Sequence, residues 1–288
     1  MTAMPLADDA LAELELDLLL EAIYRCHGHD FRHYARAALR RRMEQALPKL
    51  GEPTVAHLLP RLLHEPGFFA KLFAQLSITV TEMFRDPTTF LALRRDILPR
   101  LGDRPALKLW AAGCATGEEA WSLAILLHEL GFAERAQLYA TDYHDRALQQ
   151  AREGVYPLRC MQGYTRNYQL AGGTADFVSY YHASADAARI ADELRPRITF
   201  ANHNLVTDAS FGEMHLILCR NTLIYFDRQL QDRVLALFRD SLVPGGFLCL
   251  GRRESLAGTT VADDFAVVNA AERLYQRQSR PGDAPHAR

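Results

Sequence analysis

The spacing of hydrophobic residues divides the chain into two parts with different secondary structure. Up to residue 76, apolar side chains recur every three or four positions, as in amphipathic helices. Clusters of glycine, proline and polar residues separate these stretches and mark turns. We expect four helices, over residues 11–25, 31–47, 55–63 and 67–76. Residues 1–76 are therefore predicted to form an all-helical domain.

From about residue 107, short apolar runs alternate with amphipathic stretches. This alternation predicts an α/β fold, a Rossmann-like parallel sheet covered by helices on both faces. The expected strands are residues 107–111, 137–140, 198–201, 214–218 and 247–250, with one strand or a hairpin over 265–270 and 273–276. Helices are expected at 118–130, 145–153 and 228–241. This second domain spans 107–278 and carries an insertion of short irregular elements near 154–197. Residues 77–106 are expected to be a linker that contributes to the cofactor site, and residues 279–288 a disordered tail.

Composition and charge narrow the possible functions. With 49% hydrophobic residues, 24% charged residues and a net charge of −2, the chain has an ordinary globular composition without global attraction to nucleic acid. The five cysteines form no C-x-x-C pair and the eleven histidines show no ligand spacing, so we expect neither disulfides nor a metal site. The acidic beginning does not suit a secretory signal, and no apolar run is long enough to span a bilayer. We expect a cytoplasmic protein.

A glycine turn follows the first predicted strand. Gly113 and Gly117 form a G-x-x-x-G pattern, which lets a backbone approach a ligand but also suits a plain strand–helix turn. Asp142 ends the next predicted strand, where a carboxylate can accept ribose hydroxyls. Glu118 and Glu119 would repel a pyrophosphate but accept a positively charged sulfonium. These residues favour S-adenosylmethionine over NAD as the cofactor.

Two later strand ends carry further candidates. Asn204 and Leu205 follow the third predicted strand, where an amide can bind an adenine edge or, equally well, cap a helix. Cys219 and Arg220 follow the fourth, with Tyr225 a little further on. A tyrosine in such a place is commonly a core residue with its hydroxyl satisfied. The pattern alone leaves both alternatives open.

Taken together, five motifs resemble the chemoreceptor glutamate methyltransferase family, CheR. They are residues 78–86 (ITVTEMFRD), 112–119 (AGCATGEE), 216–227 (LILCRNTLIYFD), 242–246 (LVPGG) and 250–256 (LGRRESL), and the similarity runs from about 14 to 277. The resemblance implies a class I methyltransferase sheet behind an N-terminal helical domain. It also implies methyl transfer from S-adenosylmethionine to receptor glutamates, giving methyl esters and S-adenosylhomocysteine. The implied partner is the cytoplasmic helical bundle of methyl-accepting chemotaxis receptors, bound by a monomeric enzyme without membrane insertion.

The resemblance also assigns roles to individual residues. Arg85 and Tyr225 would shape the methyl-transfer site. The chain departs from the family pattern at Thr79, where an asparagine is usual, at Met83, which replaces an aromatic, and after Tyr180-Tyr181, where an arginine is missing. The implied cofactor-binding residues are Thr79, Thr81, Arg85, Gly113, Glu119, Asp142, Asn204, Leu205, Cys219 and Arg220.

An arginine-rich stretch lies in the second predicted helix. Arg32, Arg36 and Arg40 are four apart and would line one helix face, with Arg41 and Arg42 beside them and no acidic residue between. A solvated charged face is the simplest interpretation, and nucleic acid is disfavoured because no aromatic stacking platform accompanies the arginines. In the CheR family the corresponding helix docks on acidic receptor helices.

The implied reaction needs no general base. A glutamate side chain, with a reference pKa of about 4.3, is already ionised at neutral pH. We therefore expect neither a catalytic triad nor a proton-relay histidine, and a rate that comes from positioning and exclusion of water. Two rivals remain: a methyltransferase of the same fold acting on another protein or a small molecule, and a non-catalytic cofactor-binding signalling module.

Overall fold

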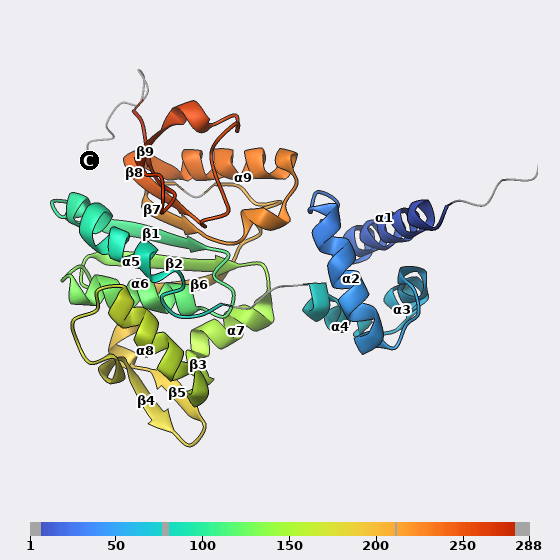
Figure 1. The fold of residues 1–288 in the computed structure, drawn as a ribbon, viewed down its shortest axis with the longest axis horizontal. Helices are drawn as coiled ribbons and strands as arrows, with labels where there is room; N and C mark the ends of the chain where they lie inside the picture. The colour runs from blue at the N-terminus through green and yellow to red at the C-terminus, as the bar shows by residue number, and fades with distance from the viewer. Residues whose placement is uncertain (1–6, 77–80, 211, 280–288) are drawn as a thin grey trace, which may run out of the picture. The chain divides into compact units, whose positions relative to one another are not determined.

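The computed structural model describes residues 7–76, 81–210 and 212–279 (Figure 1). The chain forms two compact units. One comprises the residues up to Ile78 together with Tyr225–Gln231, and the other comprises Thr79–Ile224 and the residues from Asp232 onward. Each unit has its own buried apolar residues, and each is described by itself below.

The helical unit, blue in Figure 1, consists of short helices packed by their apolar faces. Leu19 and Ile23 on the first helix, Leu39 on the second and Phe68 and Leu72 on the fourth are all fully buried. The bounds are α1 Asp8–His27, α2 Arg36–Leu50, the 3-10 turn η1 Val55–His57, α3 Leu58–His64 and α4 Phe68–Leu76. The predicted third helix is thus divided into a 3-10 turn and a short α-helix.

The second helix begins five residues later than predicted. Just before the helix, His33 and Ala35 make backbone hydrogen bonds to a distant segment. The Ala35 N–H donates to the Tyr225 carbonyl at 2.8 Å, and the Asp227 N–H donates to the His33 carbonyl at 2.8 Å. Tyr34 and Phe226 form an isolated bridge, with their rings edge to face at 5.0 Å. These tertiary bonds hold the backbone extended before α2.

The second unit contains a mixed seven-stranded sheet in the order β6-β2-β1-β7-β8-β10-β9. The first five strands in this order are parallel, whereas β10 runs antiparallel to β8 and β9. The strands are β1 Leu107–Ala112, β2 Ala136–Asp142, β6 Ile198–Asn202, β7 Met214–Cys219, β8 Leu242–Leu250, β9 Phe265–Asn269 and β10 Leu274–Arg277. The connecting helices are α6 Glu118–Glu129, α7 Asp145–Glu153 and α9 Arg228–Ser241. The α/β fold with N-terminal helices is confirmed, but the sheet is not purely parallel.

Residues 87–101 form helical turns that pack into the core of the second unit. They form α5 Pro87–Ala92, the π-helical turn η2 Leu93–Ile97 and the 3-10 turn η3 Leu98–Leu101. Before α5, Phe84 and Asp86 both have φ of 52°, a left-handed conformation unusual for a bulky residue. Phe84 is fully buried, and its N–H donates to Ser122 Oγ at 2.8 Å. Tertiary contacts therefore hold this backbone in place.

The insertion is more regular than the sequence indicated. It contains α8 Met161–Leu170 and a three-stranded antiparallel sheet in the order β3-β5-β4, made by β3 Val155–Pro157, β4 Tyr181–Ser184 and β5 Ala187–Ile190. The 3-10 turns η4 Leu158–Cys160, η5 Phe177–Tyr180 and η6 Asp192–Leu194 complete it. The expectation of irregular elements was therefore wrong. Strands of three or four residues are too short to show a recognisable alternation of apolar and polar residues in the sequence. In the described part of the chain, no helix is long and apolar enough to cross a bilayer.

Candidate functional site

The parallel strands bring most of the candidate residues to one edge of the sheet. Because β6, β2, β1 and β7 are parallel neighbours, their carboxyl ends lie at the same edge. Gly113 follows β1, Asp142 ends β2, Asn204 follows β6 and Cys219 ends β7. From β1 the chain continues to β2 and β6 on one side, then returns to β7 on the other. This reversal is the place where open α/β sheets bind ligands.

The turn after β1 is fixed by two neighbours. The N–H groups of Gly113 and Cys114 donate to the Thr141 carbonyl at 2.8 and 2.9 Å. Gly113 has φ of 73°, and a Cβ added there would lie 2.6 Å from Thr222 Oγ1. The glycine is therefore required both by the backbone conformation and by the close approach of the loop after β7.

Asp142 braces this turn through both carboxylate oxygens. Oδ2 accepts the Ala115 N–H and Oδ1 accepts the His144 N–H, each at 2.9 Å. Burial raises the pKa of Asp142, and these two amides oppose the shift. A carboxylate oxygen can accept more than one hydrogen bond, so capacity remains for a ligand hydroxyl. Asp142 is thus a structural residue of the turn as well as a candidate for ribose binding.

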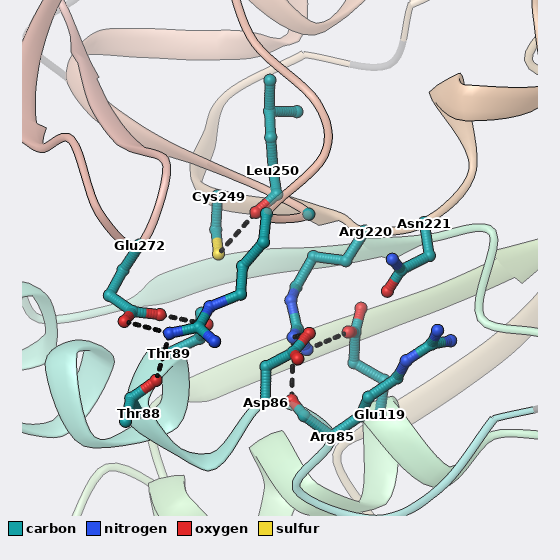
Figure 2. A network of polar contacts seen from close by, with 12 residues as sticks. Arg85, Asp86, Thr88, Thr89, Glu119, Arg220, Asn221, Cys249, Leu250 and Glu272 are labelled. Carbon is teal, nitrogen blue, oxygen red and sulfur yellow. Dashed lines mark hydrogen bonds and ion pairs between the residues drawn. The ribbon is translucent and has the colours of Figure 1, made fainter.

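A buried arginine joins three segments at this edge (Figure 2). Arg220 Nη1 donates to Glu119 at 2.8 Å, while Nη2 donates to Asp86 and to the Arg85 carbonyl, both at 2.8 Å. The Arg220 side chain is 1% exposed. Burial raises the pKa of Glu119, and the charge of Arg220 opposes this. The structure therefore brings Arg85, Glu119 and Arg220 together, as their common assignment to the cofactor site requires.

Asn204, Leu205 and Cys219 are less available to a ligand. The Asn204 side-chain oxygen accepts the Val206 N–H at 2.9 Å. The backbone N–H of Asn204 donates to the Asp208 carboxylate, also at 2.9 Å, so Asn204 stabilises a turn. Leu205 is buried, as is Cys219, and burial raises the pKa of the Cys219 thiol well above its usual value. No helix follows Asn204, so the helix-capping alternative is not observed; Asn204 stabilises a turn, and its side-chain Nδ2 takes no part in these bonds.

The remaining candidates lie at the ends of two segments. Thr81 is half-buried at the start of the described segment before α5, and Thr79 lies outside the described residues. Tyr225 closes the 3-10 turn η7 Leu223–Tyr225, and its ring lies 4.3 Å below the guanidinium of Arg42.

Arg32 does not share a helix face with Arg36 and Arg40. It precedes α2, so the prediction of one helix carrying all three side chains was wrong. Its guanidinium pairs with Asp30 at 2.9 Å and with Glu21 at 3.2 Å, and it lies over the Tyr24 ring. The backbone pairing of residues 33–35 described above is the physical reason, since it excludes Arg32 from the helix.

Arg36 and Arg40 do lie one turn apart on α2, but both face the acidic helix α1. Arg36 pairs with Asp17, and Arg40 pairs with Asp9 and with Glu13. The sequence does not reveal these partners, because they are about 20–30 residues distant, beyond any helical spacing. The two arginines are not a free positive surface.

The last two arginines of the stretch have opposite environments. Arg42 is buried, donates to the Leu76 carbonyl at 2.5 Å and covers Tyr225, so it is a core residue of the helical unit. Arg41 is exposed and makes no ion pair with any described residue. Arg41 is therefore the arginine of this stretch that is exposed without an ion-pair partner among the described residues.

Glu118, beside the glycine turn, has a role that the sequence does not reveal. Its carboxyl accepts the Thr116 hydroxyl at 2.6 Å and the Tyr164 hydroxyl of α8 at 3.4 Å. Burial raises its pKa from 4.5 to about 7. From the sequence, only its charge was considered, as one that would repel a pyrophosphate and accept a sulfonium. No local pattern shows that a tyrosine 46 residues away closes over it.

The residues at this edge fit S-adenosylmethionine. Asp86, Glu119 and Asp142 make the edge acidic, which suits a sulfonium and disfavours a pyrophosphate. Arg220 Nε is buried and has no hydrogen-bond partner among the described residues, so a donor is left for a cofactor carboxylate. No group of three or more His, Cys, Asp or Glu side chains in the described part of the chain could hold a metal ion. The fold and this edge define an S-adenosylmethionine-dependent methyltransferase.

Comparison with known proteins specifies the family. Residues 79–274 match the model of the "CheR methyltransferase, SAM binding domain", and residues 14–77 match the "CheR methyltransferase, all-alpha domain". The chain belongs to the CheR methyltransferase family. Counted along its own strands, the main sheet has the order 3-2-1-4-5-7-6.

Three relatives illustrate the similarity. A protein of Pseudomonas putida named Cher3, whose name gives its methyltransferase activity as provisional, is 45% identical over 92% of this chain and 97% of its own length. "Chemotaxis protein methyltransferase 2" of Pseudomonas aeruginosa is 31% identical over 82% of this chain and 84% of its own. "Chemotaxis protein methyltransferase" of Listeria innocua is 28% identical over 85% of this chain and 92% of its own length.

Replacing Asp142 should weaken cofactor binding. Asp142→Ala removes an acceptor that braces the glycine turn and is our candidate for the ribose hydroxyls, and each such bond contributes about 1.5–3 kcal/mol. We expect the Kd of S-adenosylhomocysteine, measured by calorimetry, to rise at least about tenfold. Asp240→Ala, which removes an exposed carboxylate from α9, should leave the Kd unchanged. Equal affinities of the Asp142 variant and the wild type would remove Asp142 from the binding site.

Glu118 should make the stability of the protein depend on pH. Its pKa is raised to about 7 in the fold, so the folded state keeps a proton that the unfolded chain releases. The stabilisation is present below about pH 4.5 and is lost as the pH rises through about 7. Glu118→Gln keeps an acceptor for Thr116 without ionising, and should raise the Tm by about 3–6 °C at pH 8 and little at pH 5.

Calorimetric melting curves at several pH values test this expectation. Glu134→Gln, at a fully exposed position, is the matched control and should melt like the wild type at every pH. A Tm difference between Glu118→Gln and the wild type that stays constant from pH 5 to 8 would contradict the raised pKa.

Proposed function

We propose that this methyltransferase modifies glutamate side chains in the cytoplasmic helical bundle of methyl-accepting chemotaxis receptors. The products would be glutamate methyl esters and S-adenosylhomocysteine. The relatives named chemotaxis protein methyltransferases support this substrate, since they match more than four-fifths of the chain. On this proposal the enzyme acts in the cytoplasm and as a monomer.

The observation that carries the proposal is that the ionisable groups at the strand ends already have partners or stay protonated. Burial raises the pKa of the Cys114 and Cys219 thiols well above 9, so neither is a thiolate at neutral pH. Glu119 pairs with Arg220, and His144 Nδ1 accepts the Ala147 N–H. Such an edge suits an acceptor that needs no deprotonation. A glutamate carboxylate is such an acceptor at neutral pH.

The residues of the chain would act by holding and orienting the reactants. When bound, S-adenosylmethionine supplies a methyl group on a positively charged sulfur; the glutamate oxygen forms the new bond to carbon, and the sulfur keeps the electron pair. We propose that Arg220 and Glu119 hold the amino-acid end of the cofactor and that Asp142 holds its ribose. Arg85 and Tyr225 would shape the methyl-transfer site and exclude water. Orientation of this kind contributes several kcal/mol to catalysis. We also keep the implied cofactor contacts of Thr79, Thr81, Gly113, Asn204, Leu205 and Cys219 as part of the proposal.

We further propose that the helical unit docks on the receptor, with Arg41 as its main positive contact. Arg32, Arg36 and Arg40 are half-exposed and could add to this surface, but their acidic partners reduce their net charge. Arg42 is buried and would act only indirectly, by packing over Tyr225.

Methyl transfer should occur on receptor fragments and should not depend on pH near neutrality. We expect labelled methyl groups from S-adenosylmethionine to appear on cytoplasmic receptor fragments as alkali-labile esters. The single-turnover rate should be flat between about pH 6 and 8, because the acceptor is ionised throughout. Fragments with the accepting glutamates changed to glutamine are the control.

Each rival gives a different result in this assay. Label that appears on another protein or a small molecule, and never on receptor fragments, would indicate a different methyltransferase. Cofactor binding without release of S-adenosylhomocysteine under any condition would indicate a signalling module. A rate that rises steeply with pH and is abolished by replacing one histidine or cysteine would contradict the mechanism without a base.

Reversing the charge of Arg41 should weaken receptor methylation without affecting cofactor binding. Arg41→Glu replaces an exposed cation, so the KM for receptor fragments should rise about tenfold at low salt. The effect should shrink at about 0.5 M salt, where the Debye length is only a few ångström. Lys49→Glu makes the same charge change two turns further along α2 and is the matched control. Equal effects of the two variants, or none, would contradict a specific docking role for Arg41.

A further inference from the structure

Four consecutive backbone N–H groups after β7 converge on one buried side chain, that of Glu254. Oε1 accepts the N–H groups of Thr222 at 2.8 Å, Leu223 at 2.7 Å and Ile224 at 3.3 Å, while Oε2 accepts that of Asn221 at 3.0 Å. Glu254 is 4% exposed. A loop whose amides are satisfied in this way by a distant residue has its conformation set by that residue.

The segment after β8 is shaped to bring the carboxylate close to the loop. The Gly251 N–H donates to Oε2 at 2.6 Å, which makes a fifth amide bond. A Cβ added to Gly251 would lie 2.6 Å from Oε2 and 2.8 Å from the Asn221 nitrogen. Asn221 itself has φ of 59°, in the left-handed region. The segment at Gly251 and the loop at Asn221 are therefore in direct contact, and a side chain larger than glycine at position 251 would collide with the loop.

The loop held by Glu254 lies between two residues of the candidate site. Arg220 precedes it and binds Glu119, Asp86 and the Arg85 carbonyl (Figure 2). Tyr225 follows it directly and ends the same 3-10 turn that begins at Leu223. Within the loop, Thr222 is the residue that approaches the glycine turn after β1 most closely. A shift of this loop would therefore displace Arg220 and the contact of Thr222 with the glycine turn.

The chemistry at this position requires a carboxylate. A carboxylate accepts at both oxygens and donates at neither, which matches five N–H donors. A glutamine in the same place would turn an NH₂ group toward two or three of these donors and leave them unsatisfied. Burial raises the pKa of Glu254, and the amide bonds oppose that shift.

We propose that Glu254 is a positioning residue of the methyltransferase: through the backbone amides of Asn221–Ile224 it sets the conformation of the loop after β7 and, with it, the placement of Arg220. Its effect on cofactor binding, through Arg220, is independent of which acceptor the enzyme methylates. Its effect on the turnover of receptor fragments rests on the proposed function.

Two variants test this role by different routes. Glu254→Gln keeps the size of the side chain and removes an acceptor, whereas Gly251→Ala keeps the carboxylate and pushes it away from the loop. Asp264→Asn is the control for loss of a buried carboxylate, because Asp264 is 6% exposed and pairs with Arg239. Gly212→Ala is the control for an added methyl group, since a Cβ there meets nothing within 4 Å.

Hydrogen exchange, cofactor binding and turnover are measured on each full-length variant. In Glu254→Gln and Gly251→Ala we expect the amides of residues 221–224 to lose protection while the β1 and β7 amides keep theirs. The Kd of S-adenosylhomocysteine should rise about tenfold, as expected for lost charge-assisted hydrogen bonds. The kcat on receptor fragments should fall by more than the KM changes. Both controls should keep the loop protected and the Kd unchanged, even where their Tm falls.

The outcomes separate the possibilities. Wild-type affinity and wild-type protection of residues 221–224 in either folded variant would overturn the proposal. An affinity loss that Asp264→Asn shares equally would reduce Glu254 to a general stabilising residue and would also overturn it. If Glu254→Gln does not fold, Gly251→Ala decides. If the wild type methylates no receptor fragment, the proposed substrate fails, and the exchange and affinity measurements still decide the role of Glu254.

Discussion

The arrangement of the site depends on one buried positive charge. A guanidinium removed from water is costly unless it is paired and hydrogen-bonded, and breaking such a pair leaves an uncompensated charge inside the protein. Arg220 meets this requirement with Glu119 from α6, Asp86 from the segment before α5 and the Arg85 carbonyl. The start of α6, the end of β7 and the left-handed backbone at Asp86 are therefore held in one arrangement.

The acidic residues at the carboxyl edge of the sheet have two roles: they hold loops in place, and they make the edge acidic. Asp142 and Glu254 each accept backbone N–H groups from loops at the carboxyl edge of the sheet. They replace secondary-structure bonds where the chain turns, which buried amides require. The acidity that favours a sulfonium cofactor is thus partly a consequence of loop construction. An acidic residue at a strand end is consequently weak evidence for a ligand contact until its backbone partners are known.

In the helical unit, too, charged side chains have partners from a distant part of the chain. The arginines of α2 suggest a basic surface when the sequence is read locally. In the fold, α1 supplies Asp9, Glu13 and Asp17 to two of them, and Arg42 is buried over Tyr225. An interaction surface in this unit is therefore narrower than the sequence suggests. It is also coupled to the packing of α1 on α2, because the same side chains serve both.

The sequence by itself determined the features that depend on local periodicity and chain order. It predicted the N-terminal helices, the strand–helix alternation and the strand ends near Gly113, Asp142 and Cys219, because those signals lie within a few residues of one another. Only the tertiary structure decided which polar group meets which. The late start of α2, the ion pairs between α1 and α2, the bonds of Arg220 and the amides gathered by Glu254 all join residues far apart in the chain. Such contacts are fixed by burial and by the need to satisfy every buried donor, and no local pattern records them.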